Sequence, residues 1–199
     1  GAHIRARAGG AVRADPRGPS LAQAAAPSPT RPPAGRADRI GGADRIEGGD
    51  QTDTVRYDSA TSKVWVRLWA GDGLAGDALG DTLLEIENVT GSAFGDTLVG
   101  DDSVNLIDGG EGGDLISALN GDEILVGEGG ADTLTGGSGN EQFWFSVGGG
   151  ADIITDFSAG SAIGDVIRLF GRGPSVDSFA EVMSLSSQHG FNVFINLGA

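Results

Sequence analysis

Large apolar residues recur at every ninth position through the middle of the chain. When the sequence is divided into nine-residue units from Gly91, the eighth positions are Leu98, Ile107, Ile116, Leu125, Leu134 and Phe143. The sixth positions all carry a side-chain oxygen: Asp96, Asn105, Asp114, Glu123, Asp132 and Glu141. A flexible glycine-rich linker has no reason to keep an apolar residue in phase over this length. The pattern therefore predicts a β-solenoid of short strands and glycine-rich turns, with the apolar column stacked inside.

Flanking segments predict less regular elements. Alternation of apolar residues over 64–69 predicts a strand. Apolar residues at helical spacing over 175–187 predict a short helix, which begins at Ser175 or Ser178 and packs across the open end of the solenoid. Alternation over 191–197 predicts a further strand, which we expect to leave an edge without a partner. The expected fold class is all-β, with a short C-terminal helix and capping strands.

These patterns divide the chain into four segments. Residues 1–38 are expected to form a disordered Arg/Ala/Pro-rich leader or linker, because six of the seven prolines lie within the first 33 residues. Residues 39–90 hold degenerate repeats and strands, and residues 91–144 hold the regular units. Residues 145–199 are expected to form a C-terminal capping region that is truncated.

Charge is distributed unevenly along the chain. Residues 1–40 carry a formal charge of +5 and the remainder −20, for −15 overall. No lysine or arginine lies between Arg67 and Arg168. This acidic stretch excludes a nucleic-acid surface, which needs cations facing phosphate, and suits anionic lipid poorly. The sequence has no cysteine and no apolar run long enough to predict a transmembrane segment.

One unit matches a known repeat at every specified position. Residues 109–117, GGEGGDLIS, fit the nonapeptide G-G-x-G-x-D-x-U-x, in which U is a large apolar residue. The chain therefore resembles the calcium-binding repeat proteins of the RTX (haemolysin-type) family. The resemblance implies a parallel β-roll in which two nonapeptides form one coil, so that units two apart stack on the same edge. It also implies Ca²⁺ between stacked turns, held by turn carbonyls and sixth-position aspartates.

Glycine-rich turns and carboxylates suit this ion, because Ca²⁺ takes several oxygen ligands in flexible geometry. The resemblance assigns the principal metal positions to Asp96, Gly109, Gly110, Glu111, Gly112, Asp114, Gly127, Gly129, Gly130 and Asp132. Weaker candidates are Asn105, Glu123, Gly136, Gly139, Glu141, Asp44, Asp53 and Asp152. Asp152 and Asp156 are alternatively expected either to cap the stack or to lie in a solvated turn.

The two edges of the expected roll differ in their acids. Every sixth-position aspartate falls on the edge formed by the units that start at 91, 109 and 127. The units that start at 100, 118 and 136 carry asparagine or glutamate instead, which fit a turn built for aspartate less well. We therefore predict Ca²⁺ between units 91/109 and 109/127, and a weak or empty opposite edge. The 109/127 pair is the stronger, because Phe94 replaces a glycine in the first unit.

Other candidate chemistry is weak. The stretch GDGLAG, residues 71–76, lacks the following helical pattern of a dinucleotide site. The two histidines, His3 and His189, cannot form an HExxH zinc motif, and EF-hand spacing is absent. The resemblance then implies a non-catalytic, secreted bacterial module that folds on binding Ca²⁺. The family implies export by a type I secretion apparatus through a C-terminal route rather than an N-terminal signal peptide.

Two alternatives stay open at this point. The chain could be the C-terminal calcium-binding and secretion domain of a larger extracellular hydrolase, such as a serralysin-like metalloprotease or a lipase. It could also be a repeat piece of an adhesin. The coding sequence upstream of residue 1 would distinguish them, because a catalytic motif there favours the hydrolase and many further repeats favour the adhesin.

Overall fold

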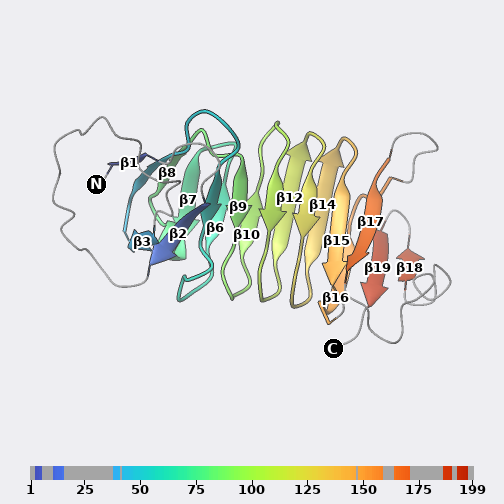
Figure 1. Ribbon diagram of the computed structural model, residues 1–199. Coiled ribbons are helices and arrows are strands. Elements are labelled where there is room, and N and C mark those ends of the chain that lie inside the picture. Colours follow the sequence, from blue (N-terminus) through green and yellow to red (C-terminus); the bar gives the residue numbers. More distant parts are fainter. Residues whose placement is uncertain are drawn as a thin grey trace.

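The computed structural model describes residues 42–146, 148–158 and 164–170, together with the backbone of five strands outside these ranges. The chain winds as a row of flattened coils, each contributing one short strand to each of two facing sheets (Figure 1). Within the regular coils, neighbouring strands of one sheet run parallel. The predicted parallel β-roll is confirmed.

Within the described residues the first sheet has eleven strands and the second has eight. The order in the first sheet is β1 (His3–Arg5), β4 (Arg45–Glu47), β8 (Thr82–Leu84), β7 (Asp72–Ala75), β6 (Trp65–Arg67), β10 (Thr97–Val99), β12 (Leu115–Asn120), β14 (Thr133–Ser138), β16 (Ala151–Ile154), β19 (Asn192–Asn196) and β18 (Ser186–His189). The order in the second is β17 (Val166–Phe170), β15 (Gln142–Ser146), β13 (Ile124–Val126), β11 (Leu106–Asp108), β9 (Asn88–Thr90), β5 (Thr54–Arg56), β2 (Ala11–Asp15) and β3 (Asp38–Ile40).

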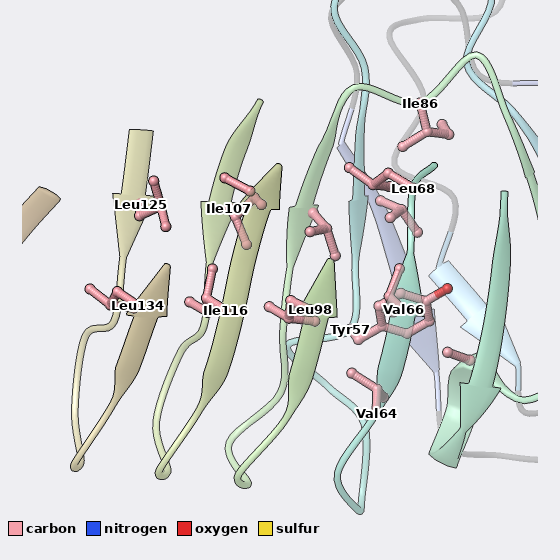
Figure 2. Packing of buried hydrophobic residues seen from close by; sticks show 14 of the residues in the cluster. Tyr57, Val64, Val66, Leu68, Ile86, Leu98, Ile107, Ile116, Leu125 and Leu134 are labelled. Carbon is pink, nitrogen blue, oxygen red and sulfur yellow. The ribbon is translucent and has the colours of Figure 1, made fainter. Parts of the chain in front are cut away.

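The apolar column sets the register of both sheets. Leu98 pairs with Ile116, and Ile116 with Leu134, in the first sheet. In the second sheet Ile107 pairs with Leu125, which pairs with Phe143. All six side chains are fully buried. Figure 2 shows five of them in two rows inside the roll, with Ile107 and Leu125 in one row and Leu98, Ile116 and Leu134 in the other. Burial of one apolar residue per strand drives the stacking, because each coil alone leaves that residue exposed on both sides.

The coils before residue 91 are less regular. After β6 the chain reverses into β7, which pairs antiparallel with both β6 and β8. Arg67 donates two hydrogen bonds to the carboxylate of Asp72 across this reversal, at 2.9 and 2.6 Å. The single 3₁₀ turn Gly76–Ala78 then leads to β8. The strand predicted over 64–69 is present as β6.

Strands near the two ends of the chain bear on two expectations. Within the segment 1–38, for which the sequence predicts a disordered leader, His3–Arg5 and Ala11–Asp15 form β1 and β2. These strands extend the two sheets because Ile4 lies in register with Ile46, and Val12 with Val55. The strand predicted over 191–197 is present as β19, but it pairs antiparallel with both β16 and β18, so it is not an edge strand.

The predicted helix over 175–187 lies outside the described residues, except for its last two positions. Ser186 and Ser187 belong to β18 rather than to a helix. They pair with Ile195 and Phe194 of β19 in an antiparallel arrangement. The chain therefore carries strand, not helix, at the point where the helical spacing was expected to end.

Candidate metal centre

The sixth-position residues gather in two rows, one along each edge of the roll. We call the turns 91–96, 109–114 and 127–132, which precede strands of the first sheet, the aspartate edge. The turns 100–105, 118–123 and 136–141, which precede strands of the second sheet, form the glutamate edge. All six sixth-position side chains are at most 2% exposed: Asp96, Asn105, Asp114, Glu123, Asp132 and Glu141.

A ladder of hydrogen bonds joins the carboxylates of the aspartate edge. The backbone N–H of Asp96 donates to Oδ1 of Asp114 at 2.7 Å. The N–H of Asp114 donates to Oδ1 of Asp132 at 2.8 Å, and that of Asp132 to Oδ1 of Asp152 at 3.0 Å. Each carboxylate therefore accepts a hydrogen bond from the preceding coil. These acids recur once per coil for this reason, and not only because each one lies in a turn.

The second oxygen of two of these carboxylates has no hydrogen-bond partner. Oδ2 of Asp114 and Oδ2 of Asp132 are both inaccessible and unpaired. Burial, reinforced by neighbouring acids, raises the pKa of Asp114 and of Asp132 to about 7. An inaccessible oxygen without a donor destabilises a fold. A cation at this position would supply the missing partner.

Glycine keeps the space beside these oxygens open. A Cβ built on Gly109 would collide with Oδ2 of Asp114 and would lie 3.1 Å from the carbonyl oxygen of Gly127. A Cβ on Gly127 would collide with Oδ2 of Asp132 in the same way. Each of these glycines therefore preserves a small space that a carboxylate oxygen lines, and beside Gly109 a turn carbonyl lines it as well.

The turn backbones stack directly on one another. The N–H of Gly112 donates to the carbonyl of Gly129 at 2.6 Å, and the N–H of Gly129 donates to the carbonyl of Gly110 at 3.1 Å. Glu111 pairs with Gly129 through the backbone, while its side chain is exposed. Gly130 adopts a φ of 143°, which favours glycine. The predicted principal residues of the turns at 109 and 127 are thus brought together.

Asp96 differs from the other aspartates of this edge, which sequence reasoning did not anticipate. Its Oδ1 accepts from the N–H of Val64 at 2.6 Å and from the hydroxyl of Ser92 at 2.9 Å. Its Oδ2 accepts from the N–H of Ser92 at 2.5 Å. Ser92 occupies the second position of its unit, where the repeat has glycine, and this substitution was the available signal.

The glutamate edge has no comparable ladder. Asn105 is already hydrogen-bonded, since its amide donates to the carbonyl of Glu87 in the preceding coil at 2.7 Å and its Oδ1 accepts the N–H of Asp101 at 2.8 Å. Both carboxylate oxygens of Glu123 lack partners, and burial raises its pKa to about 7. Burial and a hydrogen bond with Asp165 raise the pKa of Glu141 to about 8. Gly136 lies against the Glu141 side chain, and Gly139 stacks over Gly121.

The upstream candidates occupy equivalent places in the irregular coils. The N–H of Asp44 donates to Oδ1 of Asp81 at 3.0 Å, and the N–H of Asp53 donates to Oε2 of Glu87 at 2.8 Å. Asp44 and Asp53 immediately precede β4 and β5, as sixth positions do. Asp81 escaped sequence reasoning because it lies outside the nine-residue phase, beyond the β6–β7 reversal. Glu87 lies nine residues before Asp96, in phase, and was missed because the division into units began at Gly91.

Two downstream aspartates cap the stack. Asp152 accepts from the N–H of Asp132, as described above. The carboxylate of Asp156 accepts from the N–H of Gly136 at 2.9 Å and of Gly137 at 2.7 Å. Of the two expectations for these residues, capping of the preceding coil is the one that the hydrogen bonds support. Asp165 caps Glu141 in a similar way, at 3.1 Å, and was not foreseen.

The available ligands suit calcium better than a metal that is held by side chains alone. Among the described residues no three Asp, Glu, His or Cys side chains converge in an arrangement that could hold a metal. The aspartate edge instead offers inaccessible carboxylate oxygens beside stacked turn carbonyls. Ca²⁺ accepts both kinds of oxygen, and its flexible coordination tolerates such a mixture. The residues present therefore fit the ion that the repeat implies.

Comparison with protein families agrees with this geometry. The RTX calcium-binding nonapeptide repeat matches in four copies, over residues 41–59, 86–116 and 117–154. The unmatched residues between 59 and 86 are those of the antiparallel reversal. A comparison with curated proteins finds no match. The nine-residue phase, the parallel coils and the matched repeats together identify this chain as an RTX repeat protein that carries calcium-binding nonapeptides.

Proposed function

We propose that the chain binds Ca²⁺ between stacked turns of the aspartate edge, most strongly between the turns at 109 and 127. The observation that carries this proposal is the pair of inaccessible, unpartnered oxygens Oδ2 of Asp114 and Oδ2 of Asp132. These carboxylates and the neighbouring turn carbonyls would hold the ion. When bound, Ca²⁺ supplies the positive charge that this acidic stretch lacks.

We further propose that the roll binds asymmetrically. The aspartate edge carries a continuous carboxylate-to-amide ladder that fixes each acid relative to the next coil. On the glutamate edge Asn105 is neutral and already hydrogen-bonded, and the ladder is absent. Pre-positioned ligands pay less conformational entropy on binding, so the aspartate edge should bind more tightly.

The proposed role is structural and non-catalytic: the roll folds when Ca²⁺ binds. An ion that binds only the folded form stabilises it by about 2.7 kcal/mol per site at a concentration of one hundred times Kd. The buried acids oppose folding without the ion, because their ionised forms lose hydration. This coupling fits export of an unfolded chain from a cell low in Ca²⁺, and secretion through a type I apparatus by a C-terminal route is part of the proposal. No helix among the described residues is long and apolar enough to cross a membrane.

Calorimetric titration of the full chain with Ca²⁺ tests the binding. Replacing Asp114 and Asp132 together by asparagine should abolish most of the uptake, whereas replacing Glu123 and Glu141 together by glutamine should leave most of it. Absence of uptake in the parent chain at millimolar Ca²⁺ would refute the proposal. Equal losses in the two double variants would refute the asymmetry alone. Identical far-UV circular dichroism in EGTA and in Ca²⁺ would remove the coupling to folding.

A further inference from the structure

The aspartate edge changes character along the roll. Asp81 and Asp114 hold the same place in their coils, since each precedes a strand of the first sheet. In both, Oδ1 accepts a backbone N–H from a preceding coil, from Asp44 at 3.0 Å and from Asp96 at 2.7 Å. Their second oxygens differ. Oδ2 of Asp81 accepts the hydroxyl of Tyr57 at 2.9 Å, whereas Oδ2 of Asp114 has no partner.

Tyr57 is fixed for this role by its surroundings. It is completely buried, and Figure 2 shows its ring inside the core cluster. Its N–H donates to the carbonyl of Thr90 at 2.9 Å, and its carbonyl accepts from Ala60 at 2.8 Å. Backbone hydrogen bonds through both its N–H and its carbonyl therefore fix Tyr57 in place. Its hydroxyl supplies a donor at a position where the later coils have an unpaired carboxylate oxygen.

Ser92 provides a second built-in donor one coil further along. Its hydroxyl and its N–H both donate to the carboxylate of Asp96, which leaves neither oxygen of that acid without a partner. Ser92 is itself buried, at 3% exposed. In the next two turns of this edge the described residues supply no donor to the second carboxylate oxygen, and Oδ2 of Asp114 and of Asp132 are both unpartnered.

Counter-charges follow the same division. Among the described residues, the irregular coils contain the ion pairs Arg45–Glu47, Arg56–Asp58 and Arg67–Asp72. Between Arg67 and Arg168 the sequence has no basic residue. Exposed pairs of this kind stabilise a fold only slightly, but they relieve the repulsion between acids that a chain without cations retains.

We infer that the coils of residues 42–99 fold without calcium, because the hydroxyl of Tyr57 and the N–H of Ser92 already satisfy the second carboxylate oxygens, Oδ2 of Asp81 and Oδ2 of Asp96, which the ion would satisfy in the later coils. Residues 109–154 then stack onto this preformed end only when Ca²⁺ is bound. The inference rests on the proposed calcium function and adds a direction to it: ion-dependent order extends from the coil of β6 and β10 toward β16.

Hydrogen exchange of the full chain, followed by mass spectrometry in EGTA and in Ca²⁺, tests this directly. In EGTA we expect protected amides over 45–57 and 82–99 and unprotected amides over 115–154, with Ca²⁺ protecting the latter range. Loss of protection in both ranges in EGTA, restored in both by Ca²⁺, would overturn the inference and leave the calcium function standing. No effect of Ca²⁺ on either range would remove the calcium function, and the inference with it.

A hydroxyl deletion tests the role assigned to Tyr57. In EGTA, Tyr57→Phe should speed exchange over 82–84 about tenfold, because it leaves Oδ2 of Asp81 buried without a donor. Thr54→Val is the matched control, because it removes a hydroxyl of the same calcium-independent coils that accepts the side-chain amide of Asn88 at 3.3 Å. Unchanged exchange over 82–84 in Tyr57→Phe would overturn the inference. If Tyr57→Phe does not fold, hydrogen exchange of the parent chain over 45–57 and 82–99 in EGTA decides the inference by itself.

Discussion

Replacing Asp114 by asparagine should have opposite effects with and without calcium. Without the ion, the variant removes a buried negative charge while keeping an oxygen that can accept the N–H of Asp96. The new amide can also donate in the space where Oδ2 lacks a partner, toward the carbonyl of Gly127. With the ion, the variant loses a charged ligand. We therefore expect Asp114→Asn to raise the folded fraction of the regular coils in EGTA, where most of them are unfolded, and to destabilise these coils in Ca²⁺.

The magnitude follows from the pKa of this carboxyl. Burial is the largest cause of its rise from 3.8 to about 7. At about 1.4 kcal/mol per pKa unit, ionising the buried group costs up to about 4 kcal/mol, and solvent screening in the turn reduces this to about 2 kcal/mol. We expect Asp114→Asn to recover about 2 kcal/mol in EGTA at pH 8. In saturating Ca²⁺ the loss of one site should cost a similar amount or more.

Far-UV circular dichroism in EGTA at pH 8 measures the folded fraction of the regular coils, and urea unfolding in millimolar Ca²⁺ measures their stability. Asp102→Asn is the matched control, because Asp102 is exposed and accepts only the side-chain amide of Asn120, at 2.7 Å. This control should change neither quantity. Destabilisation by Asp114→Asn in both conditions would show that its carboxylate stabilises the metal-free fold, which would refute the argument from burial.

Three further predictions concern pH and the turns. The buried acids have raised pKa values, so the metal-free fold binds protons that the unfolded chain releases. The stability of the metal-free fold should therefore be greatest below about pH 4 and fall as the pH rises to about 8. Thermal unfolding in EGTA across this range checks the direction of the change. Gly127→Ala should lower calcium affinity at least tenfold in calorimetry, because the new methyl group collides with Oδ2 of Asp132, whereas Gly113→Ala, with 3.2 Å to its nearest atom, should change it much less. Glu128→Gly should raise the stability in Ca²⁺ by about 0.5 kcal/mol, measured by urea unfolding, because Glu128 is exposed and adopts a φ of 63°. Glu111→Gly is the control, because Glu111 has no positive φ, and it should give no such gain. An equal gain in both variants would contradict the backbone argument.

The regular coils could be predicted from the sequence because one apolar residue per strand sets their register. The spacing of Leu98, Ile116 and Leu134 is itself the repeat of the coil, and their burial leaves no other alignment of the strands. The same phase placed the carboxylates of Asp114 and Asp132 on one edge, where the structure has them.

The irregular coils could not be predicted in this way. Asp44 and Asp81 interact across 37 residues, which is not a multiple of nine, because the β6–β7 reversal lies between them. No repeat spacing connects Tyr57 with Asp81, although the Tyr57 hydroxyl donates to the same carboxylate oxygen, Oδ2, that is unpartnered in Asp114. Ser92 was visible as a departure from the repeat, but only its geometry shows that a hydroxyl at this position satisfies Asp96.

The two sheets end at different levels, and this limits how such rolls can associate. The first sheet continues beyond β16 through the antiparallel strands β19 and β18, whereas β17 is the last described strand of the second. Joining a second molecule end to end would require both sheets to offer level edges for one parallel coil. Among the described residues, this difference of two strands leaves no level pair of edges on which a further parallel coil could stack.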